Sequence, residues 1–238
     1  MDKAINGNQP FHQYAAERLN VSPEEMEKLV AEYTDMQVLY RSALRSVIAR
    51  LEILDDEFQY RHKRNPIHTI QTRLKSPQSM LEKLGRRNLS PSIDVMRTEL
   101  TDIAGVRVIC PYVEDIYQLA DLLCSQDGIE MVRAHDYIKR PKPNGYRSLH
   151  VVVKVPVNLS DGKEMVPVEI QIRTIAMDFW ASLEHELRYK SLAKINRDIV
   201  LELRDCADNI AELDDRMQRI YHQLEKIEDN KHRRFLEK

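Results

Sequence analysis

The chain has 238 residues, of which 42% are hydrophobic, so it can bury one substantial core. Its 36 Lys and Arg residues are balanced by 38 Asp and Glu residues, which leaves a formal net charge of −2. This balance argues against a protein that coats nucleic acid through overall positive charge, so any basic site must be local.

The first part of the chain, residues 1–20, contains charged and polar side chains where a secretory signal would need an unbroken apolar run. No later apolar run is long enough to cross a membrane, and the three cysteines form no C-x-x-C pair. We therefore expect a cytoplasmic protein. Residues 1–20 are expected to be a flexible N-terminal extension, and residues 21–238 a single domain that includes the terminal helices.

A long helical segment begins at Ser22. The sequence Ser-Pro-Glu-Glu is typical of a helix start, with Ser22 as the N-cap, proline in the first turn and acidic residues near the positive end of the helix dipole. Apolar residues then recur at helical spacing through Leu54. The pattern predicts one or two long helices.

The segment from Arg61 to Arg87 is the one concentrated basic stretch, with eight Lys or Arg residues and a single acid. A Ser-Pro pair predicts a helix start inside it, so Lys83 and Arg86 share a helix face. Together with Arg73 and Lys75, they could clamp a triphosphate, whose oxygens accept bidentate bonds from arginine. The alternative is a basic helix face that is exposed to solvent.

Three later blocks are rich in β-branched and aliphatic residues: AGVRVICPYV, SLHVVVKVPVNL and MVPVEIQIRT. The last two are joined by Ser160-Asp-Gly-Lys163, a good hairpin turn, so these two strands are expected to be antiparallel. Between the first two blocks, EDIYQLADLLCSQDG has helical periodicity and is expected to end at Gly128. After Thr174 the chain reads as helical, apart from breaks near Asn196. The predicted fold is α+β, with long helices on both flanks of a sheet and fraying over the last ten residues.

Two carboxylates stand near the predicted strands, Asp102 at the start of one and Glu169 inside another. If the strands are neighbours, the carboxylates converge at one end of the sheet. Transfer of a phosphoryl-type group from a nucleotide needs a cation, and Mg²⁺ is commonly held by one or two carboxylates plus the substrate. The alternative is structural: Asp102 caps a turn, and Glu169 pairs with Arg107 or Arg173.

A loop with four cations, Lys139-Arg-Pro-Lys-Pro-Asn-Gly-Tyr146-Arg147-Ser-Leu-His150, leads into the second block. The Tyr146 ring could stack on a purine while neighbouring cations meet its phosphates. The alternative is a hairpin loop in which Tyr146 packs at the end of a strand.

The helix predicted after the third block places Trp180, Leu183 and Leu187 on one face. We expect Trp180 to pack in the core rather than against a ligand. Glu184 and His185 could orient a substrate, although their spacing alone does not favour that role.

An adjacent His135-Asp136 pair is typical of metal-dependent phosphohydrolases. Such a centre needs further His and Asp ligands from other helices, and the remaining histidines show no matching pattern. No hydrolase activity is therefore expected.

Three runs of the chain, DIAGVRVIC, DYIKRPKPNGYRSLHVVV and VEIQIRTIAMDFWASLEHELRYK, resemble the synthetase domain of RelA/SpoT homologues in order and spacing, over roughly positions 45 to 225. Without a hydrolase domain before them or regulatory domains after them, the chain resembles the stand-alone small alarmone synthetases. The resemblance implies a nucleotidyltransferase-like mixed β-sheet flanked by helices. It also implies transfer of the β,γ-pyrophosphate of ATP to the 3′-hydroxyl of GDP or GTP, giving AMP and ppGpp or pppGpp in a bacterial stringent response.

The resemblance also assigns roles on the ATP side of the site. The ATP phosphates would meet a basic cluster, and one further arginine would line the adenine side. Asp102 matches a Mg²⁺ ligand, and Glu169 matches a residue that helps to hold Mg²⁺ and activates the acceptor hydroxyl as general base. The basic residues assigned to ATP are Arg73, Lys75, Lys83, Arg86 and, at the adenine, Arg107.

On the side of GDP or GTP, Tyr146 matches an aromatic residue that stacks on guanine. Asp178 stands where some small synthetases have Asn at the guanine edge, and its carboxylate could still accept hydrogen bonds from guanine N1 and N2. The other residues that the resemblance places near the acceptor and its phosphates are Lys142, Arg147, His150 and Gln171.

The last helices correspond to the part through which small synthetases assemble as homotetramers, although amphipathic spacing also fits packing on the chain's own core. The alternative function is a catalytically inactive nucleotide- or RNA-binding regulator. A pure binder has no need for two carboxylates beside the phosphates, so the enzyme is favoured and RNA is not predicted as a partner. The sequence leaves open the preference between GDP and GTP, and any control by alarmone.

Overall fold

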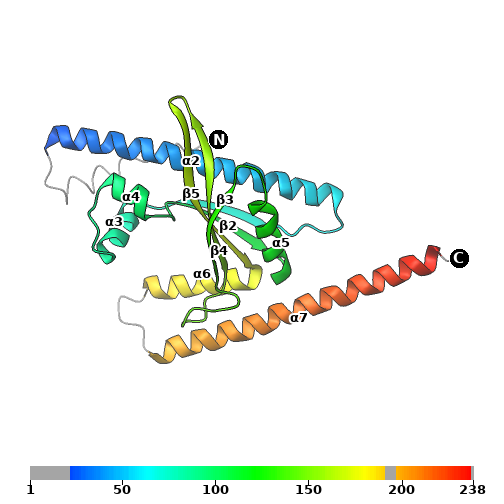
Figure 1. Ribbon diagram of the computed structural model, residues 1–238. Helices are drawn as coiled ribbons and strands as arrows, with labels where there is room; N and C mark the ends of the chain where they lie inside the picture. The colour runs from blue at the N-terminus through cyan, green and yellow to red at the C-terminus, as the bar shows by residue number, and fades with distance from the viewer. Residues whose placement is uncertain (1–21, 191–196, 237–238) are drawn as a thin grey trace.

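The computed structural model describes residues 22–190 and 197–236 (Figure 1). It is an α+β fold with a five-stranded mixed sheet and helices around it, which confirms the predicted class. The extension expected over residues 1–20 and the break expected near Asn196 lie outside the described residues. No described helix combines the length and apolar character that crossing a membrane would require.

The sheet has the strand order β1-β2-β5-β4-β3. β2 and β5 run parallel, and the other neighbours are antiparallel. The central strands match the three predicted blocks, and the hairpin between the last two is confirmed, since Leu159 pairs with Gly162. Both edge strands, β1 and β3, are additional to the prediction. The bounds are β1 Thr69–Leu74, β2 Ala104–Cys110, β3 Glu130–Asp136, β4 Leu149–Leu159 and β5 Gly162–Thr174.

Helix α2 (Pro23–Arg61) is one continuous helix that extends beyond the periodicity through Leu54. Its predicted cap is confirmed, because Ser22 Oγ accepts a hydrogen bond from the Glu25 amide at 3.3 Å and Glu25 Oε2 accepts one from the Ser22 amide at 2.7 Å. One face of α2 is buried against β2, β4 and β5 (Figure 1). Its buried residues include Tyr33, Met36, Tyr40, Val47, Leu51, Leu54 and Phe58.

The remaining helices lie around the sheet (Figure 1). The Ser-Pro helix start is confirmed at α3, where Ser76 Oγ accepts from the Ser79 amide at 3.3 Å. The helix after β2 ends at Cys124 rather than at Gly128, which lies in the following turn with φ +80°. α7 is helical through Leu236, and residues 237 and 238 of the segment expected to fray lie outside the described residues. The bounds are α3 Pro77–Arg86, α4 Ile93–Glu99, α5 Val113–Cys124, α6 Ile175–Lys190 and α7 Arg197–Leu236.

The two faces of the central strands differ in polarity because side chains alternate along each strand. One face is apolar and buried under α2 and α5, and its residues include Val106, Val108, Val151, Val153, Val168, Ile170 and Ile172. The opposite face carries polar side chains in register: Arg107 is opposite Gln171, which is opposite His150. Residues directly opposite one another on neighbouring strands share a face, so this register gathers polar groups on one surface.

Helices α6 and α7 pack against each other at that side of the sheet (Figure 1). Trp180 is buried, as predicted, and its Nε1 donates a hydrogen bond to the Leu203 carbonyl at 2.8 Å. Leu183 and Leu187 are 45% and 52% exposed, so of these three residues only Trp180 is buried. The Thr174 hydroxyl at the start of α6 donates to Asp214 of α7 at 2.6 Å, which ties the two helices together a second time.

Candidate active site

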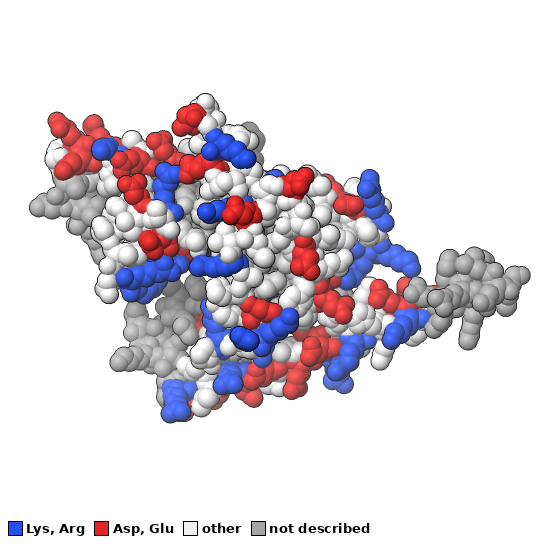
Figure 2. All heavy atoms as spheres, in the orientation of Figure 1, with Lys and Arg blue, Asp and Glu red and all other residues white. Residues whose placement is uncertain are grey.

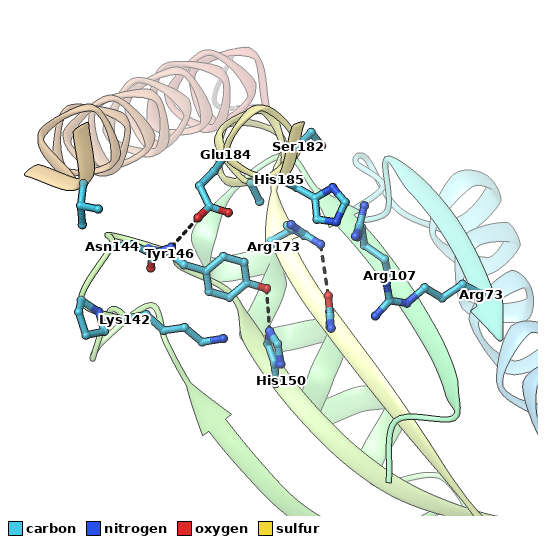
Figure 3. A pocket seen from close by; sticks show the side chains of 14 residues that line it. Arg73, Arg107, Lys142, Asn144, Tyr146, His150, Arg173, Ser182, Glu184 and His185 are labelled. Carbon is cyan, nitrogen blue, oxygen red and sulfur yellow. Dashed lines mark hydrogen bonds between the residues drawn. The ribbon is translucent and has the colours of Figure 1, made fainter. Parts of the chain in front are cut away.

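The polar face of the sheet forms one wall of a cavity of about 790 Å³ (Figure 3). The loop before β4 and helix α6 form further walls, and α7 contributes Val200. The lining contains four basic side chains, from Arg73, Arg107, Lys142 and Arg173, together with Tyr146, His150, Gln171, Glu184 and His185. A cavity with this many cations and an aromatic ring fits a ligand that carries several phosphates and a flat base.

Strand pairing explains how residues from distant parts of the chain meet. Arg73 of β1 is opposite Gly105 of β2, which is opposite Glu169 of β5. Arg73 lies over Gly105, where a Cβ would be in ordinary van der Waals contact, 3.6 Å from Arg73 Cγ. Arg73, Asp102, Arg107 and Glu169 all line a second, smaller cavity of about 100 Å³ that shares residues with the first.

Asp102 is held by two lysines of the basic segment. Its Oδ2 lies 2.6 Å from Lys75 Nζ and 2.7 Å from Lys83 Nζ. Burial alone would raise the pKa of Asp102, but the two lysines outweigh it and hold the pKa below its usual value, so the group is an anion at neutral pH. Asp102 Oδ1 is buried and has no hydrogen-bond partner among the described residues. Asp102 is thus bound by lysines rather than acting as a turn cap. Lys75 and Lys83 do not form a solvent-exposed basic face, because both pair with Asp102.

Glu169 faces a histidine and an amide. Its Oε1 lies 3.6 Å from His150 Nδ1, and its Oε2 accepts a hydrogen bond from Gln171 Nε2 at 2.8 Å. Burial would raise the pKa of Glu169, but His150 and Gln171 outweigh it and lower the pKa, so the carboxylate is ionised at neutral pH. The alternative pairing of Glu169 with Arg107 or Arg173 is not found among the described residues.

Tyr146 lies next to His150 in the cavity wall (Figure 3) and also has an aromatic neighbour in Tyr137. Its hydroxyl is 2.8 Å from His150 Nε2, and its ring centroid is 6.1 Å from that of Tyr137. Lys142 Nζ lies 4.6 Å from the centroids of both tyrosine rings. The ring is therefore part of the cavity wall rather than packed only at a strand end, with a cation beside it.

Asp178 lies between two arginines. Its Oδ1 is 3.5 Å from Arg107 Nη1 and 3.5 Å from Arg173 Nε. These contacts do not satisfy hydrogen bonding, because Asp178 Oδ1 and the Nε atoms of both arginines are buried without a hydrogen-bond partner among the described residues. Asp178 is not among the residues that line either cavity, and its predicted contact with a guanine edge stays a prediction.

Four predicted cations are not among the residues that line the two cavities: Lys75 and Lys83, which pair with Asp102, and Arg86 and Arg147. Arg86 is exposed on α3. Arg147 turns away toward α7, where its Nη2 donates to Asp208 Oδ1 at 2.8 Å. The guanidinium of Arg147 thus has partners on the helix, and its predicted contact with the acceptor phosphates stays a prediction.

Sequence reasoning gave no site role to Arg173 and Asn144, which line the cavity. Arg173 is only 2% exposed and its Nη2 donates to Gln171 Oε1 at 3.3 Å. Burial lowers the pKa of the Arg173 guanidinium, which nevertheless stays protonated. A period-2 pattern could have found it, since Glu169, Gln171 and Arg173 alternate with buried aliphatic residues along β5. Asn144 is tied to α6 by a hydrogen bond from its Nδ2 to Glu184 Oε1 at 3.0 Å (Figure 3).

The basic character is local, as the near-neutral composition requires. Figure 2 shows Lys and Arg side chains close together beside α3, on a face where acidic and basic groups are otherwise interspersed. Within the described part of the chain, no group of three or more His, Cys, Asp and Glu side chains could hold a metal ion. A site for a cation here would therefore use two carboxylates and complete its ligands from the substrate, as is common for Mg²⁺.

Comparison with known proteins agrees with this fold and site. A family model described as a region found in RelA / SpoT proteins matches residues 72–194. The GTP pyrophosphokinase YwaC of Bacillus subtilis is 38% identical over 194 residues, which cover 82% of this chain and 92% of that protein. The GTP pyrophosphokinase YjbM of the same organism is 34% identical over 192 residues, with coverage of 80% and 89%. The chain therefore belongs to the RelA/SpoT family.

Solved structures show the same architecture. The small alarmone synthetase 1 of Bacillus subtilis, bound to its product pppGpp, aligns with a TM-score of 0.75 at 34% identity, covering 80% of this chain and 97% of that one. The small alarmone synthetase 2 of the same organism aligns with a TM-score of 0.73 at 38% identity, covering 81% and 99%. The predicted family and the mixed sheet flanked by helices are confirmed by these alignments.

Proposed function

We propose that this protein is a (p)ppGpp synthetase, a GTP diphosphokinase that transfers the β,γ-pyrophosphate of ATP to the 3′-hydroxyl of GDP or GTP. The products are AMP and ppGpp or pppGpp. The observation that carries the proposal is the meeting of Asp102 and Glu169 in one small cavity that opens beside a larger one lined by four cations and Tyr146. The relatives named GTP pyrophosphokinase, and related structures bound to pppGpp and to AMPCPP, support it.

The donor set fits Mg²⁺, which we propose as the cofactor. Asp102 Oδ1 is buried and lacks a hydrogen-bond partner among the described residues, so it has a free lone pair for a cation. Both carboxylates are ionised at neutral pH, and hard oxygen anions are what Mg²⁺ prefers. Asp102 and Glu169 would hold the ion, which when bound would neutralise charge on the phosphate oxygens of ATP.

The ATP side of the site is proposed to lie between β1, β2 and α3. Arg73 and Arg107 line both cavities, which supports the proposal that Arg73 meets the phosphates of ATP and Arg107 its adenine. Lys75 and Lys83 each form an ion pair with Asp102, and we propose that they also bind the phosphates. Charged donors of this kind stabilise the charge that develops as the pyrophosphoryl group is transferred.

The acceptor side is proposed to lie between the loop before β4 and α6. Tyr146 would stack on guanine, with Lys142, His150 and Gln171 toward the sugar and phosphates. Glu169, an anion beside the polar face of the sheet, would accept the proton of the 3′-hydroxyl as that oxygen attacks the β-phosphorus of ATP. AMP then leaves as the anion.

The test is an incubation of purified protein with ATP, Mg²⁺ and GDP, GTP or GMP in turn, with the nucleotides resolved by ion-exchange chromatography. We expect AMP to appear in step with a more phosphorylated guanosine product, and to disappear when Mg²⁺ is chelated with EDTA. Absence of AMP from folded protein with every acceptor would overturn the proposal. The noncatalytic RNA-binding alternative has no observation in its favour.

Three wider features are proposed with this function. Residues 21–238 would form one synthetase domain, and the enzyme would work in the cytoplasm, where its free thiols Cys110, Cys124 and Cys206 stay reduced. It would assemble as a homotetramer, because α7 exposes a row of large apolar side chains, Leu213, Met217, Ile220, Leu224 and Ile227, each at least 43% exposed. Light scattering of the protein as it elutes from a size-exclusion column gives its molar mass and so tests the proposed homotetramer.

A further inference from the structure

The loop that carries Tyr146 lies against the backbone of α7. Gly145 is buried with φ +91°, a conformation that favours glycine. A Cβ at position 145 would lie 2.6 Å from the Cβ of Ala207 and 3.1 Å from the Cα of Arg204. The loop can therefore approach the helix this closely only because residue 145 has no side chain.

Arg147 bridges the same contact. Its Nη1 donates hydrogen bonds to the carbonyls of Gly145 and Ala207, both at 3.1 Å. Its Nη2 donates to Asp208 Oδ1 at 2.8 Å, and Asp208 Oδ2 lies 4.0 Å from Arg204 Nε. One guanidinium thus joins the loop backbone, the helix backbone and a helix carboxylate, and its side chain is only 14% exposed.

The loop of residues 142–147, which Arg147 joins to α7, is compact. The Gly145 amide donates to the Lys142 carbonyl at 2.8 Å, and the Lys142 amide donates to the Tyr146 carbonyl at 3.1 Å. Asn144 ties the same loop to α6 through Glu184. The direction in which Tyr146 presents its ring is thus set by two helices, and the residues of α7 that hold the loop, 204–208, are not among those that line the cavity.

We propose that α7 positions the acceptor loop, residues 142–147, and that Asp208 is a positioning residue that acts through Arg147. The inference rests on the proposed function for the identity of the acceptor. The described interactions of the Asp208 side chain are with Arg147 and Arg204, neither of which lines the cavity, so its effect on a guanine nucleotide passes through the loop. Any movement of α7 at residues 204–208 then changes acceptor binding without changing the ATP side.

The variants that test it are Asp208→Ala and Arg147→Ala, with Asp205→Ala as the matched control. Asp205 is exposed on the same helix, and the one hydrogen bond that the structure gives its side chain is from Asn209, at 3.3 Å. GDP binding is measured by calorimetry without ATP, and ATP-analogue binding is measured separately. Amide hydrogen exchange of residues 142–147 reports the loop directly.

We expect Asp208→Ala to weaken GDP binding about two- to fivefold, because the carboxylate is half exposed. Arg147→Ala should weaken it about tenfold, since three hydrogen bonds are lost. Both variants should speed exchange in the loop and leave binding of the ATP analogue unchanged, and the double variant should resemble Arg147→Ala alone because the two residues act together. Asp205→Ala should match the wild type.

Two results would overturn the inference while leaving the enzyme intact. If Arg147→Ala weakens GDP binding but Asp208→Ala changes neither binding nor loop exchange, Arg147 acts without the helix carboxylate. If both variants weaken ATP-analogue binding to the same degree, the effect is a general loss of structure. Failure of the wild type to bind GDP is a different result, because it would overturn the proposed function itself, including the identity of the acceptor.

Discussion

His150 Nδ1 lies 3.6 Å from Glu169 Oε1 at the centre of the sheet's polar face. The other ring nitrogen, Nε2, is 2.8 Å from the hydroxyl of Tyr146. The imidazole therefore connects the carboxylate proposed as base with the ring proposed to stack on the acceptor. Because His150 and Gln171 outweigh burial and lower the pKa of Glu169, the base is ready to accept a proton at neutral pH.

Replacing Glu169 by Gln should remove this base. We expect Glu169→Gln to slow AMP formation by about 10²-fold or more, because an amide cannot accept the proton of the 3′-hydroxyl. The melting temperature should stay near that of the wild type. Glu164→Gln is the matched control, since Glu164 lies on the same strand, outside both active-site cavities, and pairs with Arg97. Unimpaired turnover of Glu169→Gln would exclude Glu169 as the base.

Tyr146 should contribute mainly through its ring. We expect Tyr146→Ala to raise the dissociation constant of GDP by about tenfold, since stacking on a base is worth about 1–3 kcal/mol. Tyr146→Phe keeps the ring and loses the contact of the hydroxyl with His150, so its affinity should stay much closer to the wild type. Calorimetric titration with GDP separates the two variants, and equal losses for both would show that the hydroxyl, not the ring, matters.

The pH dependence of stability should report Asp102. Its folded pKa lies below its ordinary value, because Lys75 and Lys83 outweigh the effect of burial. A carboxyl group of this kind stabilises the fold above its unfolded pKa and loses that contribution as the pH falls through the folded pKa. The wild type should therefore melt above Asp102→Asn at pH 7, and the gap should shrink below about pH 4.

Thermal unfolding of both proteins between pH 7 and 3 checks this. Asp161→Asn, a change at an exposed turn, is the control and should give a small gap at every pH. A gap between wild type and Asp102→Asn that widens as the pH falls would contradict the assigned direction of the pKa shift.

Arg64 should be important for stability away from the site. Its Nη1 and Nη2 each donate to Asp115, at 2.5 Å, and the Asp115 side chain is fully buried. The guanidinium also lies beside the stacked rings of Tyr112 and Tyr221, 5.1 and 4.6 Å from their centroids. Arg64→Met should cost about 3–5 kcal/mol, because it leaves a buried carboxylate without its partner.

The neighbouring Arg61 provides the control. Its pair with Glu57 is exposed on the surface of α2, at 3.5 Å, so Arg61→Met should change stability by less than about 1 kcal/mol. Urea unfolding measures both differences. Similar values for the two variants would mean that the buried pair contributes no more than the exposed one.

Local signals in the sequence were sufficient for much of the fold. The cap at Ser22, the Ser-Pro start of α3 and the hairpin between β4 and β5 each depend on a few neighbouring residues, and all three are confirmed. The three central strands are apolar because they are buried, so composition reveals them. Most of the candidate site residues were likewise chosen from family motifs, each of which is a run of consecutive residues.

Both edge strands escaped prediction for a physical reason. β1 is half-buried to exposed and β3 is exposed along nearly its whole length, so neither carries an apolar alternation. Each is a strand because its backbone pairs with β2 or β4, which lies far away in the sequence. A pairing of that kind leaves no periodic trace in the residues themselves.

For the candidate site, too, the sequence and the tertiary structure each account for a different part. The sequence by itself determined which chemical groups are present: two carboxylates, a run of cations and a tyrosine on a glycine-containing loop. Only the tertiary structure decided which of them meet. The parallel pairing of β2 with β5 brings Glu169 into the same cavity as Asp102, and the packing of α7 turns Arg147 outward. These relationships depend on contacts between segments distant in sequence, which no local pattern of residues encodes.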